Sequence, residues 1–412
     1  MNPKQEKPCL VCKAPVSPFI SYGQQPIANG FLKPEDFSRE YFFEMQVGFC
    51  SHCKMVQLME QPDRERMFNE NYAFFSGTSQ HMAIHFKEFA DHVMKDYLEA
   101  KDPFVVEIGS NDGVMLKNFA EKKIRHLGIE PSKNVADVAI GRGINTVSRF
   151  FDAETARWIV SQNGQADAFL AANVMCHIGY IHSVLEGIDV LLRPDGTVMF
   201  EDPYLGDVIQ KTSYDQIYDE HVFLYSVASV GHMFGQYGME IVDVEPQTTH
   251  GGSMRYVIKR KGVQAVSERV REQVEFEKKL GLDKAETYER FRENCETSKR
   301  ELRQLLVDLK QQGKRVVGYA ATSKSTTVIN YCNLTPDLIE FIGDSTPIKQ
   351  GKFSPGKHIP ILASEKFREQ YPDYGLLFGW NHFKEITAKE QDFRESGGKW
   401  IVYVPKVQVI TA

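Results

Sequence analysis

The stretch Val105-Val-Glu-Ile-Gly-Ser-Asn-Asp-Gly113 runs from a β-branched strand through a glycine-containing turn into the start of a helix. Gly109 allows the backbone to approach a ligand closely, and Gly113 allows the helix to pack on the strand. Asn111 stands where glycine is frequent, and asparagine tolerates left-handed dihedrals better than other non-glycine residues. A strand, a tight turn and a helix start in this order predict a site for an adenosine-bearing cofactor in an α/β sheet.

Acidic side chains before, within and after this turn narrow the choice of cofactor. Glu130 ends the second predicted strand, where a carboxylate can accept hydrogen bonds from both hydroxyls of a ribose. Glu107 stands two positions before the glycine and is predicted to meet the ammonium group of a methionine moiety, with Asp112 in the turn itself. NAD enzymes share this arrangement, but the turn lacks the Gly-x-Gly-x-x-Gly pattern that supports a pyrophosphate. The sequence therefore favours S-adenosylmethionine.

Two later positions complete the predicted cofactor site. Phe150 or Phe151, after the third strand, could stack on adenine, and a place in the core is the alternative. Asn173 ends the fourth strand and is expected to face the crevice in which ligands of such sheets bind. We take Phe151 and Asn173 as cofactor-binding residues.

The order of predicted elements divides the 412 residues into three regions of an α/β protein. Residues 1–80 are predicted to form short strands and loops. Residues 81–262 start with a helix and then alternate strands and helices, which predicts a mostly parallel, doubly wound, Rossmann-like sheet. Residues 263–412 begin with two charge-rich helices, broken near Gly281, and continue as a second Rossmann-like unit.

Four of the seven cysteines form two pairs, Cys9-Leu-Val-Cys12 and Cys50-Ser-His-Cys53. Each Cys-x-x-Cys turn can direct two thiolates at one metal, and two such turns complete a tetrahedral zinc site. Redox motifs or buried thiols are the alternatives, but neither pair lies in a thioredoxin-like context. Four thiolates leave no open coordination position, so the zinc is predicted to be structural.

Composition argues against several classes of partner. The formal net charge is −6, with acidic and basic residues mixed along the chain, whereas nucleic-acid binders usually concentrate basic residues on one face. The N-terminus lacks the apolar segment of a secretory signal, and no apolar run approaches the roughly 18 residues that span a bilayer. We expect a cytoplasmic monomer that binds neither nucleic acid nor membranes.

Downstream segments carry candidate acid–base and anion-binding groups. The segment from Tyr214 to His221 supplies a histidine beside Tyr218 and Glu220, which suits general-base chemistry, although a lone histidine is more often structural. Lys324 begins a helix after a small-residue turn, where helix N-termini meet phosphates. NAD binding at this turn is the less favoured alternative because the glycine set is incomplete.

These segments resemble the nucleotide-sugar C-methyltransferases, which methylate a carbon next to a ketone. The shared motifs run in order over nearly the whole chain: the paired Cys-x-x-Cys module, Glu-Ile-Gly-x-Asn-Asp-Gly, Phe-Glu-Asp-Pro-Tyr-Leu, Ile-Tyr-Asp-Glu-His, His-Gly-Gly-Ser-x-Arg, Gly-Tyr-x-Ala-x-x-Lys-Ser and Trp-Asn-His. The resemblance implies a zinc-binding module, a central S-adenosylmethionine-dependent domain and a C-terminal domain that helps to hold the nucleotide-sugar.

The resemblance also assigns residues to the reaction. It implies that His221 is the general base, with Tyr72, Tyr218 and Glu220 around the sugar, and that a TDP- or GDP-linked 4-keto-deoxysugar is methylated at position 3 through an enolate. The expected substrate contacts are His177, Tyr204, His250, Arg255, Ser323, Lys324, Asn381 and His382.

Two other functions remain open at this stage. O- or N-methylation of another metabolite would need only the central region and would leave the C-terminal unit without a role. An RNA methylase with a zinc ribbon would explain the cysteines, but the acidic balance opposes it.

Overall fold

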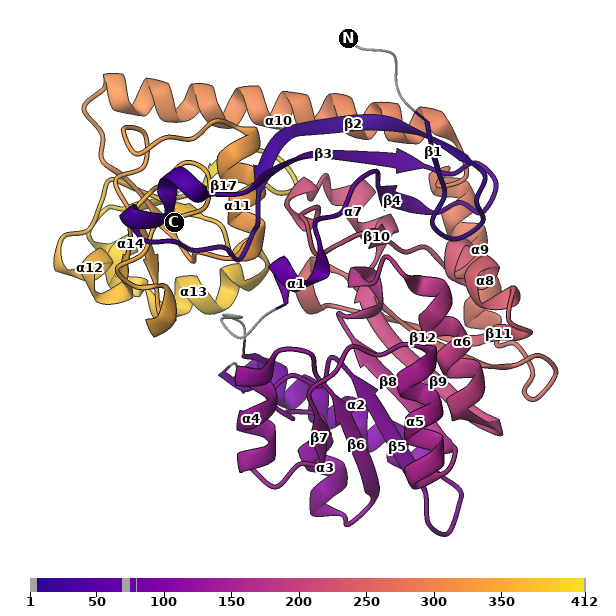
Figure 1. Ribbon diagram of the computed structural model, residues 1–412. Helices are drawn as coiled ribbons and strands as arrows, with labels where there is room; N and C mark the ends of the chain where they lie inside the picture. Colours follow the sequence, from indigo (N-terminus) through magenta and orange to yellow (C-terminus); the bar gives the residue numbers. More distant parts are fainter. Residues whose placement is uncertain (1–5, 69–74, 79, 411–412) are drawn as a thin grey trace.

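The computed structural model describes residues 6–68, 75–78 and 80–410, and three β-sheets organise them (Figure 1). The first sheet packs under the long helix α10 (Ala285–Gln311), the second lies in the central part of the chain and the third in the C-terminal part. Among the described residues, no helix combines the length and apolar character that a membrane crossing requires.

The first sheet is antiparallel and has the order β1-β2-β3-β4-β10. Along β2 buried and exposed residues alternate, so one face of the strand packs on the core. Its last strand, β10, comes from the middle of the chain and pairs with β4. The strands are β1 (Lys7–Pro8), β2 (Pro15–Pro26), β3 (Phe42–Phe49), β4 (Val56–Leu58) and β10 (Phe223–Leu224), and the short helices are η1 (Pro34–Arg39), α1 (Arg64–Met67) and η2 (Ser76–Thr78).

The four paired cysteines meet beside this sheet. Cys9 Sγ lies 3.5 Å from Cys53 Sγ, and Cys12 Sγ lies 3.4 Å from Cys50 Sγ. All four sulfur atoms lie within 4.8 Å of one another, close to the roughly 3.8 Å edge of a tetrahedron with Zn–S bonds of about 2.3 Å. The cluster therefore fits a zinc ion held by four thiolates.

The two cysteine turns have the same backbone geometry. In the first turn the amide of Lys13 donates to the Cys9 carbonyl, and in the second the amide of Lys54 donates to the Cys50 carbonyl. Both lysines have positive φ angles, 65° and 62°. The repeated turn explains how each Cys-x-x-Cys segment directs both thiolates toward one point.

The second sheet has the order β11-β12-β9-β8-β5-β6-β7. Strands β5 to β9 run parallel, as predicted for a doubly wound sheet, while β12 and β11 are antiparallel. The chain leaves β5 toward β6 on one side and returns to β8 on the other. The carboxyl ends of β5 and β8 therefore form the switch point at which such sheets bind ligands.

The strands of this sheet are β5 (Phe104–Ile108), β6 (Arg125–Ile129), β7 (Thr146–Val147), β8 (Ala166–Ala172), β9 (Leu192–Pro203), β11 (Met239–Gln247) and β12 (Ser253–Arg260). The helices of this part of the chain are α2 (Gln80–Asp96), α3 (Leu116–Glu121), α4 (Lys133–Gly141), α5 (Ala153–Asn163), η3 (Met175–His177), α6 (Ile181–Leu191), α7 (Leu205–Lys211), η4 (Tyr214–Gln216), α8 (Val227–Gly235) and η5 (Thr249–Gly251).

Two helices lead into the third sheet. Helix α9 (Glu268–Leu280) ends at Gly281, whose φ of 76° breaks the helical run as predicted, and α10 follows. Helix α10 contacts both β2 and β13, so it joins the first sheet to the third (Figure 1). The third sheet has the order β15-β14-β13-β16-β17-β18 and is parallel except for β18.

The strands of the third sheet are β13 (Val316–Tyr319), β14 (Ile342–Asp344), β15 (Ile361–Ala363), β16 (Tyr374–Leu377), β17 (Lys399–Val402) and β18 (Gln408–Ile410). Its helices are α11 (Ser323–Tyr331), η6 (Pro347–Lys349), α12 (Ser364–Glu369), η7 (Trp380–His382), α13 (Phe383–Lys389) and α14 (Gln391–Glu395).

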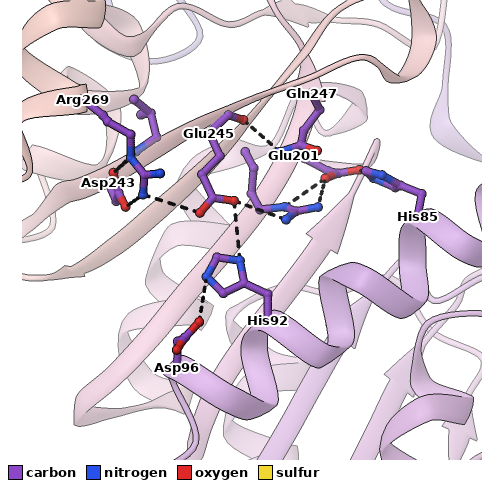
Figure 2. A network of polar contacts seen from close by, with 10 residues as sticks. His85, His92, Asp96, Glu201, Asp243, Glu245, Gln247 and Arg269 are labelled. Atoms are coloured by element: carbon purple, nitrogen blue, oxygen red, sulfur yellow. Dashed lines mark hydrogen bonds and ion pairs between the residues drawn. The ribbon is translucent and has the colours of Figure 1, made fainter.

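A buried charge network fastens α2 to the second sheet (Figure 2). Arg255 Nη2 on β12 donates to Glu201 Oε2 on β9 at 2.9 Å, and Glu201 Oε1 meets His85 Nε2 on α2 at 2.5 Å. Arg255 also pairs with Glu245 on β11, and its guanidinium lies 3.9 Å from the ring centre of Phe89. Burial of charges is tolerated here because each is paired.

Removing the central cation should destabilise the fold strongly. Arg255→Ala leaves Glu201 buried without its main counter-charge, so we expect a loss of about 3–5 kcal/mol in the free energy of unfolding. Arg269→Ala is the matched control, because Arg269 lies at the outer end of the network with 56% of its side chain exposed, and it should cost less than about 1 kcal/mol. Urea unfolding measures both, and equal losses would contradict the assignment.

The cysteine cluster makes a second prediction. Purified protein should contain zinc in equimolar amount by atomic emission, and a strong chelator should lower the Tm, because metal binding contributes directly to folding. Cys50→Ser should reduce the zinc content, whereas Cys332→Ser, which changes a buried thiol outside the cluster, should retain it. Full zinc content in the Cys50 variant would refute a four-thiolate site.

Candidate active site

A cavity of about 280 Å³ lies where the three parts of the chain meet. Its walls come from the carboxyl ends of the central strands, from the loops that follow them and from the C-terminal unit, so no single sheet builds it. Fourteen predicted site residues line it: Gly109, Asn111, Glu130, Phe151, Asn173, His177, Tyr218, Glu220, His221, His250, Ser323, Lys324, Asn381 and His382.

The turn after β5 has the backbone that the sequence predicted. Gly109 has a φ of 57° and Asn111 a φ of 50°, both in the left-handed region. A Cβ atom at position 109 would lie 2.3 Å from the Val174 side chain, so only glycine fits there. Asn173, at the end of the neighbouring strand β8, has a φ of 58°. These two strand ends form the crevice at the switch point.

Carboxyl groups gather at this crevice. Glu130 accepts hydrogen bonds from the amides of Asn111 at 3.1 Å and Ser132 at 2.7 Å. Glu107 is buried, and its Oε2 atom has no partner among the described residues. Burial, together with the negative charges of Glu130 and Asp112, raises the pKa of Glu107 well above its usual range. A buried carboxyl oxygen without a hydrogen-bond partner at this crevice fits a positively charged ligand, and S-adenosylmethionine carries an ammonium and a sulfonium.

Three predicted cofactor residues, Glu107, Asp112 and Gly113, do not line the cavity and pack on the far side of the turn. Glu107 lies within β5. Asp112 accepts hydrogen bonds from the amide of Gly77 at 3.2 Å and from Arg142 Nη1 at 2.9 Å. Gly113 leaves room for Ile144, which a Cβ atom would approach to 3.0 Å. Gly113 therefore relieves packing against Ile144, rather than packing of the helix on its own strand.

An arginine that the sequence did not single out lies among the aromatic residues of this crevice. The Arg64 guanidinium lies 4.2 Å from the ring centre of Phe150 and 4.7 Å from that of Tyr180. Phe151 also lines the cavity, and its ring packs on Phe169 at 5.3 Å. Both phenylalanines are therefore near the cofactor crevice, and Phe151 also belongs to the core.

His221 is held in one tautomer. Its Nδ1 atom lies 2.6 Å from the carbonyl oxygen of Gln216, which can only accept, so Nδ1 carries the hydrogen and donates. The remaining ring nitrogen, Nε2, is then unprotonated. Burial, followed by the nearby His177, lowers the pKa of His221 well below its usual range. The ring is neutral at physiological pH and can take up a proton.

Two further side chains flank this imidazole. The Tyr218 ring lies 4.0 Å from that of His221, and the His177 ring lies 5.2 Å away on a nearly parallel plane. Burial and the charge of Glu220 raise the pKa of Tyr218, so its phenol stays protonated and can donate a hydrogen bond. A neutral base beside a neutral donor is the pair that enolate chemistry requires.

Cationic groups approach the cavity from the C-terminal unit. Lys324, at the N-terminus of α11, donates to the His250 carbonyl at 3.1 Å. Burial lowers the pKa of Lys324 to about 8, and the charge of Asp215 opposes that shift. Lys349 also lines the cavity, donates to the Ala321 carbonyl at 2.8 Å and has its pKa lowered by burial. Lys324, Lys349 and the N-terminus of α11 give the cavity a cationic wall, which is suited to an anion.

Asp215, which the sequence did not single out, connects the His221 loop to the C-terminal unit. Its Oδ2 atom accepts hydrogen bonds from Trp380 Nε1 at 2.6 Å and from the Tyr403 hydroxyl at 2.9 Å. A Cβ atom at Gly251 would lie 2.3 Å from the Trp380 ring. The glycine of the His-Gly-Gly motif therefore allows Trp380 to reach Asp215.

Two expected substrate contacts, Arg255 and Tyr204, do not line the cavity. Arg255 belongs to the charge network behind the sheet and does not line the cavity, because the buried Glu201 and the partly buried Glu245 hold its guanidinium. Tyr204 is also outside it, since its hydroxyl donates to Glu277 Oε1 at 2.9 Å. Tyr72 lies outside the described residues. None of the four paired cysteines lines the cavity.

Comparisons with known proteins cover nearly the whole chain. Family models match in order as a zinc-binding domain over residues 9–68, a methyltransferase domain over 82–244 and a C-methyltransferase C-terminal domain over 248–405. The C-methyltransferase NovU of Streptomyces niveus is 32% identical over 395 residues, which cover 95% of this chain and 94% of NovU.

Solved structures resemble only part of the chain. An S-adenosylmethionine-dependent methyltransferase from Anabaena variabilis is 16% identical and covers 43% of this chain and 86% of its own, with a TM-score of 0.35. Magnesium protoporphyrin IX methyltransferase from Synechocystis, with bound S-adenosylhomocysteine, is 12% identical and covers 43% and 83%, with a TM-score of 0.34.

The family matches and the site agree on the cofactors. The central domain binds S-adenosylmethionine, and the N-terminal domain binds zinc, for which its four-cysteine cluster is suited. With a relative that matches along almost its entire length, the chain belongs to the family of S-adenosylmethionine-dependent C-methyltransferases with an N-terminal zinc-binding domain and a C-terminal Rossmann-like domain.

Proposed function

We propose that the protein methylates a nucleotide-linked 4-keto-deoxysugar at the carbon next to the ketone, sugar position 3, after removing a proton from that carbon. The observation that carries this proposal is the neutral His221 with Nδ1 tied to the Gln216 carbonyl, in a cavity that the cofactor crevice and a cationic wall share. A carbon atom is a poor nucleophile unless such a base first removes an α proton.

The residues of the cavity divide the reaction between them. When bound, S-adenosylmethionine supplies a methyl group on a positively charged sulfur. His221 Nε2 takes the α proton and becomes an imidazolium, whose Nδ1 hydrogen bond to Gln216 grows stronger with the charge. The Tyr218 phenol donates to the oxygen on which negative charge develops. Burial of these groups limits the access of water that would return a proton to the carbon before methyl transfer.

The cationic wall favours a nucleotide-linked substrate over a simpler metabolite. Lys324, Lys349 and the N-terminus of α11 are suited to the diphosphate of a TDP- or GDP-sugar. O- or N-methylation of a small acceptor would leave these groups without a role. An RNA substrate would call for a broad basic face, which a net charge of −6 does not favour.

Product analysis tests this function. We expect one new carbon-bound methyl group when the enzyme and S-adenosylmethionine are incubated with a panel of TDP- and GDP-linked 4-keto-deoxysugars and the products are analysed by mass spectrometry and NMR. In deuterated water with S-adenosylhomocysteine, the α hydrogen should exchange without methylation. Transfer to oxygen or nitrogen, or turnover only on RNA, would refute the proposal.

His221→Asn should lower both kcat and the exchange rate by about 10²–10⁴-fold, with S-adenosylhomocysteine affinity unchanged. Because burial holds the pKa of His221 well below its usual range, wild-type kcat should not fall as the pH decreases through the ordinary histidine value of about 6.5. It should decline only at lower pH, where the base becomes protonated. A variant with normal exchange would exclude His221 as the base.

Because Lys324 is proposed to meet the phosphates, the affinity for the nucleotide should depend on pH through the titration of the Lys324 amine. Only the protonated amine attracts a phosphate, and the pKa of Lys324 is about 8, so the affinity for TDP or GDP should weaken as the pH rises through this value. Lys324→Arg retains the charge over that range and should flatten the profile, whereas Lys324→Ala should weaken binding about tenfold or more at neutral pH. Calorimetry measures all three. Identical profiles would show that Lys324 does not meet the phosphates.

A further inference from the structure

Asn29 belongs to the zinc-binding domain and lies in the loop that follows β2. It lines the cavity together with residues of α11 and of the loop from Tyr214 to His221, the proposed catalytic loop. Its Nδ2 atom donates to Glu220 Oε1 at 2.6 Å, and its Oδ1 atom accepts from the Ser323 hydroxyl at 3.0 Å. One carboxamide therefore contacts two segments that lie 191 and 294 residues away along the chain.

The chemistry of the two partners fixes the orientation of this carboxamide. An ionised carboxylate only accepts hydrogen bonds, so the amide nitrogen must face Glu220. The carbonyl oxygen then faces Ser323, whose hydroxyl can donate to it. Aspartate lacks the donor and leucine lacks both groups, so neither side chain could make the same two hydrogen bonds.

The neighbouring backbone makes the same two connections. The Ala28 amide donates to Asp219 Oδ1 at 2.9 Å, and the Ala28 carbonyl accepts from the Thr326 hydroxyl at 2.9 Å. Positions 28 and 29 thus bind adjacent residues of the catalytic loop on one side and α11 on the other. The zinc-binding domain is also fixed against the C-terminal unit elsewhere, where the rings of Tyr22 and Tyr331 lie 4.8 Å apart.

We propose that Asn29 is a positioning residue of the active site: its carboxamide holds the Glu220 carboxylate, and with it the His221 loop, in register with the N-terminus of α11. The zinc-binding domain then acts as a built-in part of the active site and not only as a stabilising module. The role of Glu220 and His221 in turnover rests on the proposed function, whereas the positioning of their loop does not.

Kinetics of matched variants test the proposal. Asn29→Ala removes a hydrogen bond to a charged group, so kcat should fall about tenfold or more while the KM for S-adenosylmethionine and the zinc content stay at wild-type values. Gln24→Ala is the control, because it removes an exposed amide from the same part of the chain, where Gln24 bonds to Glu44. Wild-type kcat in Asn29→Ala would overturn the proposal.

The conservative variant Asn29→Asp separates positioning from general damage. It places a second carboxylate beside Glu220, and two adjacent carboxylates repel when both are ionised but can share a proton at lower pH. Its kcat relative to wild type should therefore rise as the pH falls, whereas the ratio for Asn29→Ala should stay flat. Equal pH profiles of the two variants would argue against a contact with Glu220.

Hydrogen–deuterium exchange provides a readout that needs no sugar substrate. Peptides containing residues 214–224 should exchange faster in Asn29→Ala than in wild type or Gln24→Ala, because the loop loses its tie to the zinc-binding domain. Unchanged exchange would overturn the positioning role. If wild-type protein methylates none of the sugars but the loop still loosens, the proposed substrate is wrong and the positioning role stands.

Discussion

The hydrogen bond between His221 Nδ1 and the Gln216 carbonyl determines what the cavity can do. It leaves Nε2 as the atom that accepts a proton, and it depends on the backbone path from Tyr214 to His221. That path crosses the junction of all three sheets: Asp215 is bound by Trp380 and Tyr403, and Glu220 is bound by Asn29. Loss of any one of these hydrogen bonds would allow the loop to move and would make the orientation of the His221 ring less fixed.

Charge is distributed unequally across the cavity. Glu130 lines the cofactor crevice and Glu107 and Asp112 lie behind it, whereas the wall from the C-terminal unit presents Lys324 and Lys349. In the proposed reaction, this arrangement would draw a cationic methyl donor and an anionic diphosphate to opposite sides of the cavity. The same burial that lowers lysine and histidine pKa values raises that of Glu107, because a low dielectric disfavours every uncompensated charge.

Local sequence signals predicted the parts that depend on short-range physics. The glycines and Asn111 identified the turn because left-handed dihedrals are rare for other residues, and the cysteine pairs identified the metal cluster because each turn is complete within a few residues. The loop holding His221 was found by its residue types. Asn29, Arg64, Asp215 and Lys349 were not, because each acquires its role from a partner that only the assembled chain brings near.

The sequence also suggested substrate contacts for residues that do not line the cavity, again because their partners are known only from the assembled chain. Arg255 and Tyr204 lie in motifs that carry the family resemblance, yet both lie outside the cavity. Arg255 neutralises Glu201 so that α2 can pack on the sheet, and α2 contributes Met82 and Phe86 to the cavity wall. A residue in a shared motif can be needed because it supports the site, even when it does not touch the ligand. The motif alone does not distinguish such a residue from one that contacts the ligand.

Burial of the base carries a chemical cost that other groups must offset. A histidine with a lowered pKa remains neutral over a wide pH range, but it is also a weaker base toward an α proton. In the proposed reaction, the enolate must therefore be stabilised more than a stronger base would require. The protonated phenol of Tyr218 beside the imidazole supplies a donor in a low-dielectric setting, where such a hydrogen bond is worth more than in water. In the proposed mechanism Tyr218 and His221 would act as one unit, because the burial that weakens the base also strengthens the hydrogen bond that the phenol donates.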